Sequence, residues 1–142
     1  MKKIAWLLDQ EPSVDEKDTL RSLFEGCGGY EIVFAPLANQ PIGQKHRYPS
    51  DLTPGELETA SSCDEIIIER DEELTSRLLG CGKKPLQSVW ESFDCSHERC
   101  NYRELTFLYF HRVMDDSMRI KMLVPKGTDL GGSNPENFEV VE

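Results

Sequence analysis

The sequence predicts an α/β fold in one domain, residues 1–142, with helices flanking a mostly parallel sheet that a C-terminal antiparallel hairpin extends. Three observations predict it. Short apolar runs at 3–9, 30–37 and 64–70 are typical of buried strands. Segments that begin with helix-capping residues follow these runs, and an apolar–basic alternation comes near the C-terminus. An α+β arrangement is the alternative.

Residues 3–37 are predicted to form a β-α-β unit. KIAWLLD is a nearly continuous apolar run that ends in an acid, as a strand buried on both faces does. Ser13 and Glu16 then have capping-box spacing, and glycines at 26–29 end the helix. YEIVFAPL, which is rich in β-forming residues, supplies the second strand. The apolar face expected on the helix consists of Val14, Leu20, Leu23 and Phe24.

Two more helix starts are clear in the middle of the chain. Thr53 and Glu56 have capping-box spacing around a proline at the first helical position. Asp71 is expected to cap a helix that runs to Gly80, with acids in its first turn. After Pro85 a short helix is predicted from apolar residues at positions i, i+3, i+4 and i+7. These are Leu86, Val89, Trp90 and Phe93.

The C-terminal third predicts strands. The aromatic-rich segment 105–113 is read as a strand, with a helix over 103–113 as the alternative. Segment 118–124 alternates with period two, so the two segments form an antiparallel hairpin. FEVV at 138–141 is read as a last edge strand. The hairpin could provide an edge for strand pairing between two copies, so a homodimer is a further prediction.

The composition of the chain narrows the classes of partner and the compartment that can be expected. The net charge of −10 argues against a nucleic-acid partner and against anionic membranes, since both bind clustered Lys and Arg. It suits a soluble protein that meets a basic partner. No apolar stretch reaches ~18 residues, so no membrane span is expected. The N-terminus lacks a secretory apolar region, and the five cysteines are an odd number, so a reduced, cytoplasmic protein is expected.

Acids follow the first and third predicted strands. Asp9 and Glu11 follow the first, and Glu69 and Asp71 follow the third. Since ligands of open α/β sheets lie beyond the carboxyl ends of the strands, these side chains are candidates for a carboxylate cluster. Such a cluster could hold Mg²⁺ for phosphoester hydrolysis or phosphotransfer. The alternative is that strands simply end in solvent and that Asp71 is a helix cap.

The first forty residues resemble receiver-like domains, in which an apolar first strand also ends in acid. The sequence departs from the pattern of that family elsewhere. Gln10 separates Asp9 from Glu11, the third strand ends IIIER rather than in an aspartate, and no later Thr/Ser and Lys pair follows. The function of receiver-like domains is therefore not carried over.

The stretch FDCSHERC contains three soft metal ligands, Cys95, His97 and Cys100. Zinc is usually bound by four such ligands in two close pairs, and either His111 or Cys81 is a candidate for the fourth. A zinc-stabilised binding module is therefore one hypothesis. The alternative is a connection between secondary-structure elements, in which the cysteines behave as small apolar residues.

A basic island lies in the irregular segment 38–52. It consists of Lys45, His46, Arg47 and Tyr48. A long loop in a small domain is often functional, so this one is a candidate site for an anion or a carboxylate. The alternative is a solvated loop.

No catalytic residue is predicted, because the sequence contains no recognised catalytic motif. Whether the protein is an enzyme stays open at this point. The preferred hypothesis is a small acidic interaction or regulatory module that binds a protein partner and needs no cofactor. The magnesium-dependent enzyme and the zinc-stabilised module are the alternatives.

Overall fold

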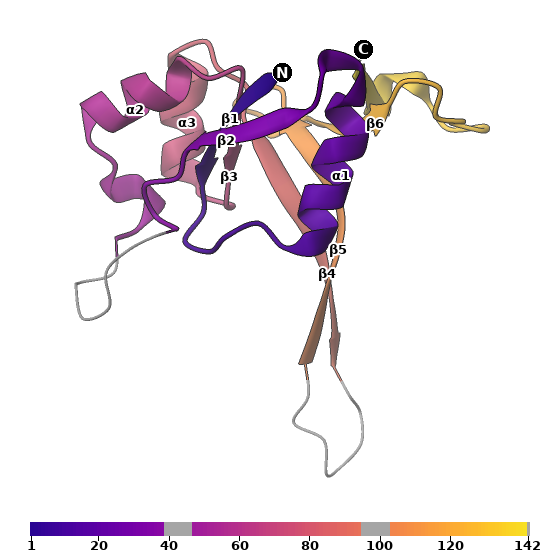
Figure 1. Cartoon of the computed structure of the whole chain (residues 1–142), viewed down its shortest axis with the longest axis horizontal. Coiled ribbons are helices and arrows are strands. Elements are labelled where there is room, and N and C mark those ends of the chain that lie inside the picture. The colour runs from indigo at the N-terminus through magenta and orange to yellow at the C-terminus, as the bar shows by residue number, and fades with distance from the viewer. Residues whose placement is uncertain (39–46, 95–102, 142) are drawn as a thin grey trace.

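A computed structural model describes residues 1–38, 47–94 and 103–141 of the chain (Figure 1). Within these ranges seven strands form one sheet with the order β2-β1-β3-β4-β5-β6-β7. The strands are β1 (Lys2–Leu7), β2 (Tyr30–Phe34), β3 (Glu65–Ile68), β4 (Leu86–Asp94), β5 (Arg103–Val113), β6 (Ile120–Pro125) and β7 (Phe138–Val141). The helices are α1 (Val14–Phe24), α2 (Pro54–Ser61) and α3 (Glu72–Gly80). No helix in the described ranges is both long and apolar enough to cross a membrane.

The three predicted parallel strands, β1, β2 and β3, are confirmed, β4 joins them in parallel, and helices cover both faces of that half. Strand β1 pairs with β2 on one side and β3 on the other, and β3 pairs with β4. From β1 the chain therefore first moves to β2 on one side of the sheet, and it then crosses back over β1 to β3 on the other side. Because crossovers between parallel strands are right-handed, α1 lies on one face while α2 and α3 lie on the opposite face (Figure 1).

The alternation within β1 shows why its sequence is apolar from Ile4 to Leu7. Ile4 and Trp6 belong to the core on the α1 side, whereas Ala5 and Leu7 belong to the core beneath α2 and α3. All four side chains are at most 1% exposed. A strand with helices on both faces needs apolar residues at every position.

The predicted helix starts are confirmed. Ser13 with Glu16 and Thr53 with Glu56 form complete capping boxes, and the Asp71 side chain accepts a hydrogen bond from the third residue of α3. One detail of α1 differs from the expectation. Val14 is 73% exposed because the first turn of α1 directs Glu16, rather than Val14, toward the sheet.

The predicted helix after Pro85 is wrong, since that segment is strand β4. It pairs in parallel with β3 at its start and antiparallel with β5 along its whole length. The apolar spacing fits one helical face, but the same residues also fit a strand of this length. Ladder pairing with distant residues decides between the two. As a result Trp90 is 40% exposed instead of buried.

The predicted antiparallel hairpin is confirmed, and the helix alternative at 103–113 is excluded. Strand β5 pairs with β6 through His111, Arg112 and Val113. FEVV forms β7, which pairs in parallel with β6 and lies at the edge of the sheet, as expected. The hairpin itself is internal, because β4 and β7 flank it. Of the two hairpin strands, only β5 keeps a free edge in the described ranges, before His111 where β6 does not accompany it, so the homodimer stays a prediction.

Strands β4 and β5 run on beyond the strands next to them (Figure 1). Strand β3 pairs with β4 only at Leu86 and Gln87, and β6 pairs with β5 only from His111 onward. The remainder, residues 88–94 and 103–110 of the described chain, is a two-stranded ribbon that we call the hairpin arm. It carries side chains past the parallel half of the sheet.

One arginine links three strands of the sheet. The guanidinium of Arg112 on β5 donates to the carboxylate of Glu65 on β3 and to that of Glu139 on β7, with closest distances of 2.9 Å. The side chains of Arg112 and Glu65 are 13% and 11% exposed. Burial lowers the pKa of Arg112, but the two carboxylates outweigh burial and raise it. The group therefore stays charged inside the sheet.

We expect Arg112→Met to lower the free energy of unfolding by about 3 kcal/mol, because it leaves two partly buried carboxylates without their cation. Urea unfolding measures the change. The control is Arg21→Met, which removes an exposed pair with Asp18 and should change stability by less than about 0.5 kcal/mol. Equal effects of the two substitutions would show that the Arg112 ion pairs contribute no more than a surface pair.

Candidate functional site

A pocket of about 390 Å³ lies beyond the carboxyl ends of β1 and β3. The chain departs from these neighbouring strands toward opposite faces of the sheet, which opens a crevice between the two connections. This is the topological switch point, where open α/β sheets usually bind ligands. We call it the switch-point pocket. Its lining residues are Trp6, Leu8, Asp9, Gln10, Glu11, Ser13, Glu16, Glu69, Trp90 and Leu105.

The structure places three of the four predicted carboxylates on this pocket. Asp9 and Glu11 come from the loop after β1, and Glu69 directly follows β3. Asp71 does not line it, since its side chain accepts a hydrogen bond from the Leu74 amide at 2.8 Å. In the described ranges no three His, Cys, Asp or Glu side chains are grouped so that they could hold a metal ion. The magnesium site stays a prediction from the sequence.

A fourth carboxylate, that of Glu16, lines the pocket and is only 3% exposed. One oxygen accepts the backbone amide of Ser13 at 3.1 Å, and the other accepts the Ser88 hydroxyl at 2.8 Å. Glu16 therefore fixes the start of α1 against β4. These two elements form two walls of the pocket. The capping box was visible in the sequence, but nothing there showed that this carboxylate faces the sheet.

Two tryptophans give the pocket an apolar wall, and they are the two that the chain contains. The indole nitrogen of Trp6 donates to the Gln10 carbonyl at 2.6 Å and holds the loop after β1. Trp90 packs edge-on against Phe107, with ring centroids 5.4 Å apart. Beside it Leu105 is 60% exposed. Sequence reasoning missed the Trp90 wall because it assigned that residue to the buried face of a helix.

The lining determines which ligands suit the pocket. Within the described ranges it holds four carboxylates and no lysine, arginine or histidine, so an anion would be repelled. A cation with an apolar body would meet carboxylates and the exposed part of an indole ring. The same lining contains no cysteine, and the Ser13 hydroxyl accepts the Glu16 amide at 3.2 Å. The chemistry therefore suits recognition of a cationic group.

The predicted basic loop lies elsewhere. Lys45 and His46 fall outside the described residues. The Arg47 guanidinium donates to the Glu56 carboxylate at the start of α2, and this hydrogen bond lowers the pKa of Glu56 to about 2. The Tyr48 residue is 61% exposed. Arg47 is thus engaged by an acid of its own chain.

The predicted zinc ligands Cys95, His97 and Cys100 also lie outside the described residues, so the zinc site stays a prediction. His111 is on the face of β5 opposite α1, and its Nε2 contacts the Gln87 side-chain oxygen at 2.7 Å. Burial and the nearby charge of Arg70 both lower the pKa of His111. Its imidazole is therefore held neutral at physiological pH.

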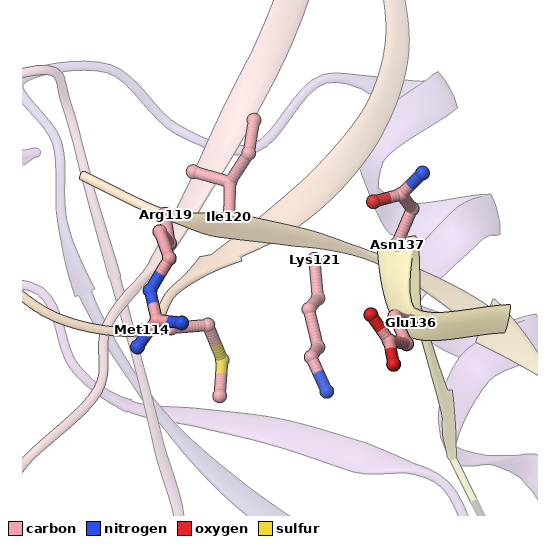
Figure 2. Close-up of a pocket in the computed structure, with 6 residues that line it drawn as sticks. All are labelled: Met114, Arg119, Ile120, Lys121, Glu136 and Asn137. Atoms are coloured by element: carbon pink, nitrogen blue, oxygen red, sulfur yellow. The ribbon is translucent and has the colours of Figure 1, made fainter. Parts of the chain in front are cut away.

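A larger pocket of about 570 Å³ lies beside β6 (Figure 2). Lys121 and Glu136 project to the same side there, near the thioether of Met114, whereas Arg119 is 80% exposed and paired with Asp115. Its charged groups have mixed sign, and those of Arg119 and Glu136 belong to exposed side chains. The switch-point pocket, with a buried carboxylate and braced aromatic rings, is the better organised site.

Comparisons with protein-family models, curated proteins and solved structures found no match to this chain.

We expect Arg47→Met to raise the pKa of Glu56 toward its usual value of 4.5. A depressed folded-state pKa stabilises the fold above pH 4.5, and that contribution is lost as the pH falls toward 2. The variant should therefore lose less stability than the original chain across this window. Carboxyl NMR titration of Glu56 measures the midpoint directly.

The matched control for this titration is Arg119→Met, which removes another cation from an ion pair but leaves Glu56 untouched. It should leave the midpoint of Glu56 unchanged. An unchanged midpoint in Arg47→Met as well would contradict the assignment of the low pKa to the Arg47 hydrogen bond.

Proposed function

We propose that this chain is a binding module that takes a basic segment of a protein partner into the switch-point pocket. The observation that carries the proposal is the combination of four carboxylates and an exposed tryptophan in one pocket at the switch point. The net charge of −10 adds long-range attraction for a basic partner and speeds encounter.

The carboxylates divide into two roles. Asp9, Glu11 and Glu69 follow the strand ends and line the pocket that an incoming arginine or lysine would enter. Glu16 is held by two hydrogen bonds inside the pocket and adds a fixed negative charge near it. A bound cation is thus attracted without requiring Glu16 to move.

The aromatic wall favours a basic side chain over a bare metal ion. Magnesium takes oxygen ligands and keeps several waters, and neither Trp90 nor Leu105 provides an oxygen ligand from its side chain. An arginine or lysine side chain instead combines a charge with an apolar stem, which can pack on both residues.

We further propose that the module works in the cytoplasm, as the sequence suggests. Among the described residues Cys63 and Cys81 form no disulfide, which accords with a reducing compartment. A homodimer remains a separate prediction and is not needed for this site.

A simple peptide tests the proposal. The probe is the acetylated and amidated hexapeptide Arg-Val-Arg-Val-Arg-Val, with a Glu-Val repeat of equal length as its control. Because both tryptophans line the pocket, intrinsic fluorescence reports its occupancy. We expect the basic peptide to bind, more weakly as salt rises, and the acidic peptide not to bind.

The triple variant Asp9→Asn, Glu11→Gln, Glu69→Gln should weaken binding about tenfold, if each carboxylate contributes roughly 0.5 kcal/mol. A matched variant with the same charge change removes three exposed acids outside the pocket, through Glu25→Gln, Glu31→Gln and Glu58→Gln. It should weaken binding less than about threefold. Equal losses in the two variants would mean that only net charge matters and that the pocket is not the site.

A further inference from the structure

Strand β4 has an open edge next to the switch-point pocket. On one side it pairs with β5 along its length, but on the other β3 accompanies it only as far as Gln87. From Ser88 to Glu91 the described residues provide no backbone partner on the β3 side. The hairpin arm thus presents unpaired backbone groups of a strand, which is a template for pairing with another chain.

This open edge and the pocket belong to one site. Strand β3 ends at Ile68, and Glu69, which directly follows it, lines the pocket together with Trp90 of β4. The space in line with β3, beyond its carboxyl end, therefore has the β4 edge on one side. The loop after β1, with Asp9 and Glu11, lines the same pocket.

We propose that the basic segment binds as an extended strand, which pairs with the open edge of β4 and continues the track of β3. This inference rests on the proposed function and adds the mode of binding. Backbone hydrogen bonds to β4 would supply affinity for any extended segment. Since side chains alternate between the faces of a strand, every second residue would enter the pocket and meet its carboxylates.

Charge distinguishes this edge from that of β7. The edge strand β7 directly follows Glu136 and Asn137 of the pocket in Figure 2, whose lining mixes Arg119 and Lys121 with one carboxylate. The open edge of β4 lies beside four carboxylates instead. Its residues 88–91 read SVWE and contain neither proline nor lysine, which commonly protect strand edges. The site therefore fits an extended segment with basic residues at alternate positions.

Backbone methylation of the same hexapeptide tests the pairing. One version carries N-methyl groups on the three arginines and the other on the three valines. Alternate amides of a strand point to the same side, so only one version places methyl groups against β4. We expect that version to bind about tenfold more weakly than the parent, and the other to stay within about threefold.

The outcomes separate the two proposals. If both methylated versions bind like the parent, or both weaken equally, strand pairing is wrong while the basic pocket stands. If the parent peptide does not bind at all, the proposed function fails and this inference fails with it. The protein is unchanged in every arm, so a folding defect cannot imitate any result.

Amide hydrogen exchange locates the added strand. With the parent peptide bound, outward-facing amides among residues 88–91 should exchange more slowly. The outer edge of β5 at residues 105–110 also lacks a strand partner in the described ranges and serves as the internal control. Protection there instead of on β4 would overturn the placement of the strand.

Discussion

The reversal of chain direction between β4 and β5 determines the shape of this protein. Up to β4 each strand needs a crossover helix, because parallel neighbours cannot be joined by a tight turn. After β4 the chain returns antiparallel and no helix is required. The two strands support each other, so they can extend past β3 and β6. The aromatic wall of the switch-point pocket exists because β4 continues where β3 has stopped.

Local signals in the sequence predicted the parallel half well. Caps such as Ser13 with Glu16 act within one turn of helix, so their residue types and spacing are sufficient evidence. The apolar spacing after Pro85 fits a helical period, and only pairing with residues 103–112 shows that the segment is a strand. Non-local pairing leaves no mark in a short window of sequence.

In the candidate site, too, the residues set by local signals could be predicted and those set by non-local pairing could not. The acids Asp9, Glu11 and Glu69 could be found because they follow strands, and parallel strands end at a common edge. Asp71 follows a strand too, but the first turn of α3 uses its carboxylate as a cap. Trp90 could not be placed on the pocket from the sequence, because its segment was predicted to be a helix. Its place on the pocket follows from tertiary structure alone.

The Arg112 ion pairs bear on how the molecule unfolds. Glu65 and Glu139 are far apart in the chain, yet they share one guanidinium. Detaching the last strand therefore removes a carboxylate from an arginine that also binds β3 near the centre of the sheet. Fraying of β7 therefore also weakens the ion pairing that holds β3 to β5. This coupling makes the two halves of the sheet one cooperative unit, although their strands run in different patterns.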